Sequence, residues 1–303
     1  METISQQVWK ILDMLQWGTE YLTKRQVSEP RLSMEWILAK VLEVKRLDLY
    51  LQFDRPLDAT QLAQIKELLQ KRARHVPLQY ILGQWDFWGL PFSVNPNVLI
   101  PRPETEILVE SMLNVLGKDA ISNPTYGLDL GTGSGNIAVA MLANLPQGRC
   151  VAVDISAKAL EQARCNAQRH AVLDRLELRR GDWFDALGQG ECGGRCFDWI
   201  VSNPPYVPDE QWESLPSEVR LHEPQQALCG GPGGLQACGS IVAGASDYLK
   251  DGGLLALEIG EGQAAAVKNF IERAEGLNFL EAKKDNNGTE RVILVRRARK
   301  KNG

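Results

Sequence analysis

The feature that most constrains this chain is the alternation of strand-like and helix-like segments that begins near residue 101. Apolar, β-prone segments predict strands at 126–130, 150–155, 175–180, 197–202, 253–259, 278–284 and 291–297. Helical patterns fall between most of them, including 104–116, 136–144, 157–170 and 235–250. Such alternation produces crossovers between parallel strands, with helices on both faces of the sheet. Residues 101–303 are therefore predicted to form an α/β domain with a mainly parallel sheet.

The first 84 residues lack this alternation and are predicted to form a small helical bundle. Apolar residues recur there at helical spacing in three stretches. Asp58 and Gln61 fit a capping box, in which two side chains satisfy free backbone N–H groups at a helix start. Between the two regions, residues 85–100 are aromatic and punctuated by Gly89 and Pro91, which indicates a hairpin-like linker.

Charge and composition exclude several classes of protein. The chain has 34 Lys and Arg against 38 Asp and Glu, but residues 85–290 alone have 16 basic and 28 acidic residues. That excess disfavours a general nucleic-acid binder, because phosphate groups attract basic surfaces. No apolar run approaches the roughly 20 residues of a membrane helix, and the N-terminus has no signal or transit pattern. We expect a cytoplasmic protein without a membrane partner.

The cysteines and histidines do not predict a metal site. Of six cysteines only Cys192 and Cys196 lie close together, and the three histidines are scattered. Structural zinc usually requires two such cysteine pairs or added histidines at short spacing. We expect no metal, and free thiols of the kind found in a reducing cytosol.

A glycine-rich loop, Gly131-Thr132-Gly133-Ser134-Gly135, joins the strand ending at Leu130 to the helix beginning at Asn136. Glycine lets the backbone turn tightly and approach a ligand closely. Ligands of open α/β sheets bind outside the carboxyl ends of the strands. The loop therefore predicts a ligand site at this edge of the sheet.

Polar and aromatic residues follow the next two strands and extend this site. Asp154 ends the second strand, where its carboxylate suits the hydroxyls of a ribose. Asp182 follows the third strand and suits an adenine amino group, while Trp183 suits packing on the base.

Two cofactors fit these residues. Gly133-x-Gly135-x-x-Ala138, with Asp154 about 20 residues further on, matches the dinucleotide fingerprint and would indicate NAD. The segment from Asp129 to Gly135 also matches the nucleoside-binding loop of S-adenosylmethionine-dependent methyltransferases. Glycine spacing does not decide between them.

The segment Asn203-Pro204-Pro205-Tyr206 follows the fourth strand and is the most informative one. Prolines remove N–H donors, so the main-chain carbonyls of Asn203 and Pro204 stay free. The Asn203 side chain adds a carbonyl acceptor, and Tyr206 offers a flat face for a planar group. Converging acceptors suit an NH2 group. The long Pro- and Gly-rich segment 204–234 is itself typical of functional loops.

These acceptors would favour methyl transfer to an amide or aromatic amine. The nitrogen lone pair is delocalised, with a strength indicated by the peptide rotation barrier of about 18–20 kcal/mol. Acceptors that hold both N–H bonds pyramidalise the nitrogen and stabilise its developing positive charge. Fixed alignment contributes about 7–11 kcal/mol. A sulfonium is a strong leaving group, so no general base or metal is required.

With these segments in order, the chain resembles the HemK/PrmC family, the protein-(glutamine-N5) methyltransferases of peptide chain release factors. The resemblance covers essentially the whole chain. Beyond the loop and Asn203–Tyr206, it rests on Pro77–Gly83, on Pro101-Arg102-Pro103-Glu104-Thr105-Glu106, on Glu223-Pro224 and on Gly253–Gly260. One departure is Pro232 within Gly230–Gly234, which makes that stretch stiffer.

The resemblance implies a Rossmann-like class I S-adenosylmethionine-dependent methyltransferase domain and an N-terminal domain that contacts the release factor. It implies a substrate glutamine in a Gly-Gly-Gln loop, S-adenosylhomocysteine as product, and a monomer. The residues implied to bind the cofactor are Gly131, Thr132, Gly133, Ser134, Gly135, Asp154, Asp182, Trp183 and Asn203. Those implied to bind substrate are Arg102, Pro103, Glu104, Thr105, Asn203, Pro204, Pro205 and Tyr206, the last four being catalytic.

Two other functions remain open. A nucleic-acid methyltransferase acting on an exocyclic amine, such as adenine N6, would use the same Asn203–Tyr206 segment on a flipped base. The acidity of residues 85–290 disfavours it, so no direct nucleic-acid substrate is expected. A non-enzymatic binding module would leave the Asn203–Tyr206 segment and the glycine loop unexplained.

Overall fold

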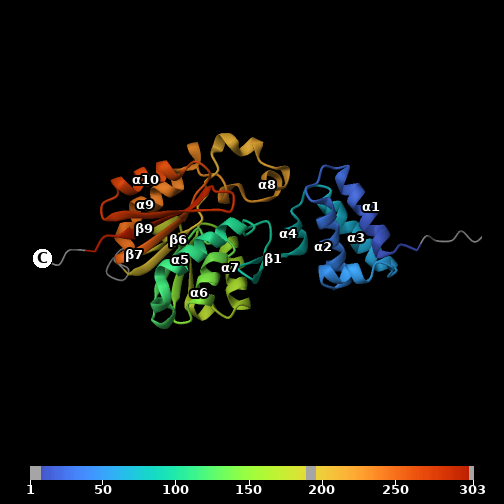
Figure 1. Cartoon of the computed structure of the whole chain (residues 1–303), viewed down its shortest axis with the longest axis horizontal. Helices are drawn as coiled ribbons and strands as arrows, with labels where there is room; N and C mark the ends of the chain where they lie inside the picture. Colours follow the sequence, from blue (N-terminus) through green and yellow to red (C-terminus); the bar gives the residue numbers. More distant parts are fainter. Residues whose placement is uncertain (1–7, 189–195, 300–303) are drawn as a thin grey trace, which may run out of the picture. The chain divides into compact units, whose positions relative to one another are not determined.

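The chain folds into two compact units, each with its own core (Figure 1). The computed structural model describes residues 8–188 and 196–299. One unit contains the described residues up to Gly83 together with Pro216–His222, and the other contains Gln84–Leu215 and the described residues from Glu223 onward. The chain therefore passes from one unit to the other three times.

The helical unit is built around amphipathic helices. Its elements are α1 (Ile11–Thr23), α2 (Pro30–Leu42), the 3-10 helix η1 (Arg46–Leu51), α3 (Ala59–Arg72), α4 (Leu78–Leu82) and α8 (Ser217–His222). Ile11, Ile37 and Ile65, one from each long helix, are fully buried in the core. The capping box is confirmed at the start of α3, where the Gln61 N–H donates to Asp58 Oδ1 (2.8 Å) and the Asp58 N–H to Gln61 Oε1 (3.0 Å).

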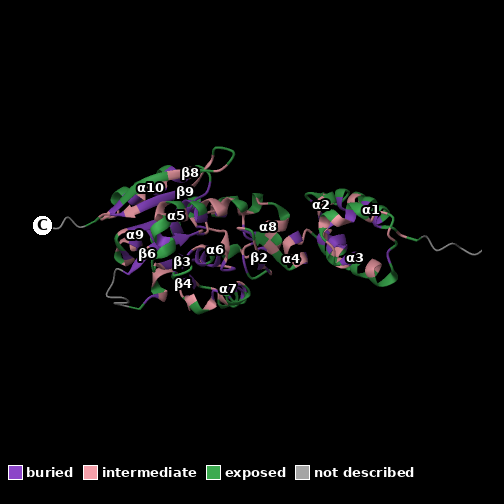
Figure 2. Cartoon of the chain, turned by 60° about the horizontal axis from the view of Figure 1, so that its bottom comes forward, coloured by how far each residue is buried: buried purple, intermediate pink, exposed green. Residues whose placement is uncertain are grey.

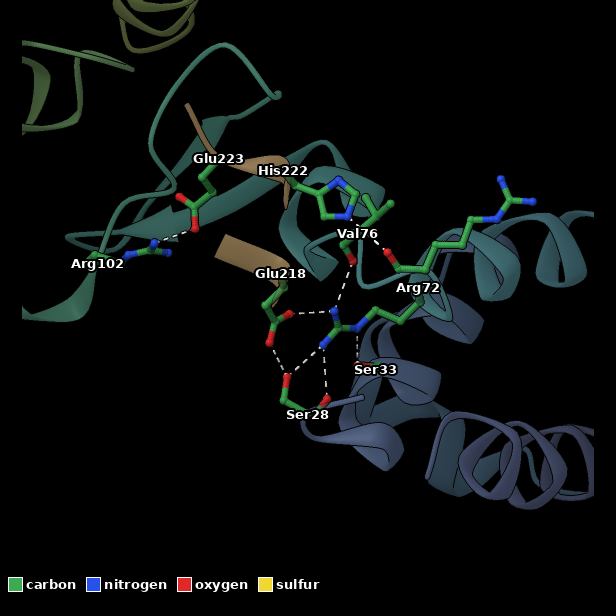
Figure 3. A network of polar contacts seen from close by, with 9 residues as sticks. Ser28, Ser33, Arg72, Val76, Arg102, Glu218, His222 and Glu223 are labelled. Carbon is green, nitrogen blue, oxygen red and sulfur yellow. Dashed lines mark hydrogen bonds and ion pairs between the residues drawn. The ribbon is translucent and has the colours of Figure 1, made fainter. Parts of the chain in front are cut away.

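A buried cation connects distant parts of the helical unit (Figure 3). The Arg72 side chain is 3% exposed, and each of its guanidinium N–H groups finds an acceptor. Nε donates to Ser33 Oγ, and one terminal nitrogen donates to the Val76 carbonyl and to Glu218 Oε2 (2.6 Å). The other donates to the carbonyl and Oγ of Ser28. Glu218, which supplies the neutralising charge, lies 146 residues further along the chain.

The larger unit contains a seven-stranded sheet in the order β5-β4-β3-β6-β7-β9-β8. The strands are β3 (Tyr126–Leu130), β4 (Arg149–Asp154), β5 (Leu176–Arg180), β6 (Phe197–Ser202), β7 (Leu249–Glu258), β8 (Leu277–Lys284) and β9 (Glu290–Arg297). Neighbours from β5 to β7 are parallel, whereas β9 pairs antiparallel with β7 and β8. The predicted mainly parallel sheet is confirmed. Its order reverses at β3, which has β4 on one side and β6 on the other; ligands bind at such switch points.

Helices cover both faces of this sheet (Figure 1). The helices are α5 (Pro103–Ser122), α6 (Asn136–Asn144), α7 (Ala157–Arg169), α9 (Gln236–Tyr248) and α10 (Ala264–Arg273). Buried side chains of α5, α6 and α7 share one core with the sheet, and those of α9 and α10 share another. The strands β3 and β6 are buried along nearly their whole length (Figure 2). This burial fits the near-continuous apolar runs from which they were predicted.

A two-stranded antiparallel hairpin begins this unit, with β1 (Gln84–Phe87) and β2 (Leu90–Ser93) joined through Trp88 and Gly89. Both turn residues have positive φ, and such turns match the twist of the paired strands. Phe87 and Phe92 are buried in the core that α5 shares. No helix in residues 8–188 or 196–299 is long and apolar enough to cross a membrane.

Candidate active site

A cavity of about 450 Å³ opens at the carboxyl ends of the parallel strands. Its volume is within the range of small-molecule sites. Residues at or after the ends of β3, β4, β5 and β6 line it, including Gly131, Gly133, Asp154, Asp182, Trp183, Asn203 and Pro205. Outside the predicted site, parts of segments 97–99 and 224–231 also line it, as do Gln236, Ala237 and Ser240 of α9. The strand order therefore gathers into one cavity residues that are more than 70 positions apart in sequence.

The glycine loop needs backbone angles that other residues rarely adopt. Gly131, Gly133 and Gly135 all have positive φ, at 72°, 55° and 79°. A Cβ atom on Gly135 would lie 3.0 Å from the Ala163 Cβ atom, whereas Gly133 borders open space. The loop thus brings bare backbone to the cavity wall at Gly133. Thr132 and Ser134 are buried and do not line the cavity.

Asp129 holds this loop from behind. Its Oδ2 accepts hydrogen bonds from the Thr132 hydroxyl (2.7 Å) and the Ala138 N–H (3.2 Å), which ties the loop to the first turn of α6. Burial raises the pKa of Asp129 to about 7, although these two hydrogen bonds act in the opposite direction.

Asp154 connects the glycine loop to the end of β4. Its Oδ2 accepts from the Gly133 N–H (2.8 Å) and its Oδ1 from the Ser156 N–H (2.9 Å). Burial raises the pKa of Asp154, while the two backbone hydrogen bonds lower it. Each carboxylate oxygen has a second lone pair, so the side chain keeps acceptors for a vicinal diol in the cavity.

Trp183 adopts a strained backbone conformation beside the cavity. Its φ is +44°, in the left-handed region that an indole side chain rarely occupies. Its ring is the nearest neighbour of a Cβ atom built on Gly131, at 3.4 Å. Strain of this kind costs about 1–3 kcal/mol and concentrates at functional sites. Asp182, which precedes it, also lines the cavity.

Asn203 lies at the end of β6 with its amide held in one orientation. Its Nδ2 donates to Thr105 Oγ1 (3.0 Å), so the orientation follows from the hydrogen-bond network. With the nitrogen committed to Thr105, the carbonyl Oδ1 stays available as an acceptor. Thr105 is 1% exposed in the first turn of α5 and does not line the cavity.

Tyr206 is anchored at both its hydroxyl and its backbone. The hydroxyl donates to Glu258 Oε1 (3.3 Å), and the main-chain carbonyl accepts from Gln263 Nε2 (2.9 Å). Burial raises the pKa of the Tyr206 phenol well above its usual range. Pro204 and Tyr206 are not among the residues that line the cavity.

Glu258 was not among the predicted site residues, although it ends β7 and accepts the hydrogen bond from the Tyr206 hydroxyl. It is 1% exposed, and burial raises its pKa to about 7, while hydrogen bonding from Thr105 and Tyr206 lowers it. The sequence carried a usable signal. Glu258 is the one charged residue in the apolar run from Leu254 to Ile259.

The segment 101–106 forms the start of α5. Pro103 occupies the first turn, where its missing N–H costs nothing. Arg102 donates to Glu223 Oε1 (2.5 Å; Figure 3). The other carboxylate oxygen of Glu223, Oε2, accepts from the Ile100 N–H. Neither Arg102 nor Glu104 lines the cavity.

The described residues contain no cluster of three or more histidine, cysteine or acidic side chains that could hold a metal ion. Of the closely spaced cysteine pair, Cys196 is buried, and Cys192 lies outside the described residues.

Known proteins resemble both parts of the chain. Residues 13–83 match the family described as PrmC N-terminal domain, and residues 104–228 match the Methyltransferase small domain. A protein of Geobacter sulfurreducens named release factor glutamine methyltransferase is 42% identical over 95% of this chain and 96% of its own length.

Solved structures add two further relatives. The release factor-specific protein-(glutamine-N5) methyltransferase of Alicyclobacillus acidocaldarius is 30% identical, covers 68% of this chain and 99% of its own, and has a TM-score of 0.41. The hMettl16 catalytic domain covers 78% of this chain and 83% of its own with a TM-score of 0.54, but at 16% identity it shows the fold alone. Identity across nearly the full length of the curated relatives confirms the resemblance read from the sequence. The chain therefore belongs to the HemK/PrmC family of release factor glutamine methyltransferases.

Proposed function

We propose that this protein transfers a methyl group from S-adenosylmethionine to the side-chain amide nitrogen, N5, of the glutamine in the Gly-Gly-Gln loop of peptide chain release factors. Full-length relatives carry the name of this activity. The single observation that carries the proposal is the Asn203 amide, held by Thr105 so that its carbonyl is free beside a nucleoside-sized cavity.

The cofactor would occupy the cavity at the strand ends. Gly131 and Gly133 bring main chain to it, Asp154 offers acceptors to the ribose hydroxyls, and Asp182 and Trp183 accommodate the adenine. Thr132 and Ser134 support the loop from within the core. When bound, the cofactor supplies an electrophilic methyl group on a sulfonium.

The residues from Asn203 to Tyr206 would hold the glutamine. Asn203 Oδ1 and the Pro204 carbonyl accept hydrogen bonds from the two N–H groups of the substrate amide. The nitrogen loses conjugation and presents its lone pair, and the same oxygens stabilise the positive charge that develops. Pro205 removes a competing N–H donor, and Tyr206 packs against the planar amide. The methylated amide then releases one proton to water.

The remaining predicted residues would act around this centre. Arg102 and Glu104 hold the start of α5, Pro103 initiates it, and Thr105 orients Asn203. We assign substrate recognition to residues 1–84, a connecting hairpin to 85–100 and catalysis to 101–303. A monomer acting in the cytoplasm, on a protein substrate and not on a nucleic acid, suits this arrangement, because a single chain supplies every proposed group.

Methylation of purified release factor tests the proposal. Wild-type protein with labelled S-adenosylmethionine should transfer the label to release factor. Asn203→Ala should lower kcat by about 100-fold or more, because one preorganised acceptor is lost. Calorimetry should show nearly unchanged cofactor affinity, since the glycine loop and Asp154 remain. Retained turnover in Asn203→Ala would contradict the proposed role of the amide.

A further inference from the structure

Glu258 is a buried carboxyl beside the residues that would hold the substrate. It ends β7, next to β6 and adjacent to the Asn203–Tyr206 segment. Its side chain is removed from solvent, and its Oε2 atom has no partner in hydrogen-bond geometry among the described residues. A buried and incompletely paired carboxyl destabilises a fold, so an apolar residue would serve the packing of this strand better.

The hydrogen-bond partner of Glu258 lies within this segment. Its Oε1 accepts from the Tyr206 hydroxyl (3.3 Å). The main-chain carbonyl of Tyr206 is held separately, by Gln263 Nε2 (2.9 Å). Glu258 is therefore the group that holds the hydroxyl end of the Tyr206 side chain.

The charged groups around Glu258 come from other elements. Glu104 at the start of α5 opposes a negative charge on it, whereas Arg291 on β9 favours one. Tyr206 follows β6 and contributes its hydroxyl. Through its hydrogen bond with Tyr206, Glu258 thus joins the end of β7 to the segment that follows β6.

We propose that Glu258 is a positioning residue for methyl transfer: it holds the Tyr206 hydroxyl and thereby fixes the orientation of the Tyr206 ring. This role rests on the proposed function of the Asn203–Tyr206 segment. Glu258 itself touches neither cofactor nor substrate. It acts by keeping the aromatic face of Tyr206 in place.

Two substitutions separate hydrogen bonding from packing. Glu258→Leu keeps a comparable volume and removes every acceptor, whereas Glu258→Gln keeps one carbonyl oxygen. Glu258→Leu should lower kcat by about 100-fold, the order expected when reacting groups are misplaced by about 1 Å. Glu258→Gln should retain most of kcat. Cofactor affinity and thermal midpoint should change little in either. Glu261→Leu, at an exposed position three residues further on, is the matched control and should keep full activity.

A double-mutant cycle tests whether Glu258 acts through Tyr206. Tyr206→Phe removes the hydroxyl and leaves the ring. If the two residues work as a unit, Tyr206→Phe with Glu258→Leu should lose less activity than the product of the single losses. Losses that multiply, together with equal losses in Glu258→Gln and Glu258→Leu, would overturn the positioning role.

A spectroscopic readout does not depend on catalysis. In protein labelled with ¹³Cζ-tyrosine, the Tyr206 resonance is the one lost in Tyr206→Phe. It should shift in Glu258→Leu and stay close to the wild-type position in Glu258→Gln. An unmoved resonance in Glu258→Leu would refute the inference even if release factor is methylated. Conversely, a moved resonance in a protein that methylates no release factor would refute only the proposed function.

Discussion

Arg72 in the helical unit and Glu258 in the larger unit are both ionisable side chains buried from water, yet their surroundings differ. Arg72 places all its N–H groups on acceptors and is neutralised by Glu218. Glu258 has one oxygen without a partner in hydrogen-bond geometry among the described residues, and burial raises its pKa to about 7. A completed network stabilises the packing around it, whereas an incomplete one costs stability. The second kind occurs here beside the proposed substrate-binding residues.

The largest expected effect concerns the completed network. Glu218→Ala leaves the Arg72 guanidinium buried without its counter-charge, and should lower the opening free energy of the helical unit by about 3 kcal/mol. This loss is at the low end of those expected for broken buried ion pairs, because the Glu218 side chain is 27% exposed. Native-state hydrogen exchange of the α2 and α3 amides measures it. An unchanged exchange rate would show that Arg72 does not depend on Glu218.

An intermediate effect concerns pH. The folded-state pKa values of Asp129 and Glu258 are raised to about 7, from ordinary values of 3.8 and 4.5. The folded protein therefore holds protons that the unfolded chain releases, and the associated stability is lost as pH rises through about 7. The free energy of unfolding should fall by about 2 kcal/mol between about pH 6 and about pH 7, about 1 kcal/mol for each group.

Denaturant titrations at several pH values measure this dependence. Glu258→Gln should make it shallower, because the amide does not titrate. An identical slope in wild type and Glu258→Gln would show that Glu258 does not titrate in this range.

The smallest effect provides a surface reference for the two buried groups. Lys71 and Glu67 form an ion pair one helical turn apart on α3, with side chains 51% and 65% exposed. Glu67→Ala should leave the opening free energy of the helical unit nearly unchanged, because solvent screens an exposed ion pair. Hydrogen exchange on the same α3 amides gives a direct comparison with Glu218→Ala. Equal losses of opening free energy in Glu67→Ala and Glu218→Ala would contradict the distinction between buried and exposed ion pairs.

The sheet could be predicted because most of its parallel strands contain short apolar runs, and because helical patterns follow β3, β4 and β7. Gly131, Asp154 and Asn203 could be placed together because they follow such strands. The antiparallel insertion of β9 between β7 and β8 could not be predicted, since periodicity does not specify strand order or direction.

Contacts between residues far apart in the sequence could not be predicted from local patterns, for the same reason. The association of α8 with the helical unit depends on the ion pair between Glu218 and Arg72, which lie 146 residues apart in the sequence. The local sequence around either residue does not predict this pair. The left-handed backbone of Trp183 is likewise imposed by its surroundings, because nothing in an indole side chain favours it. Glu258 was detectable as a charge in an apolar strand, but only the structure shows its hydrogen bond with Tyr206.

Site-resolved mass spectrometry tests the central claim most directly. Release factor is incubated with the wild-type protein and S-adenosylmethionine, and the peptide that carries Gly-Gly-Gln is fragmented. We expect a gain of one CH2 unit on the glutamine side chain, absent without cofactor and strongly reduced with Asn203→Ala. An unmodified glutamine with the wild-type protein, or a methyl group on another residue, would contradict it.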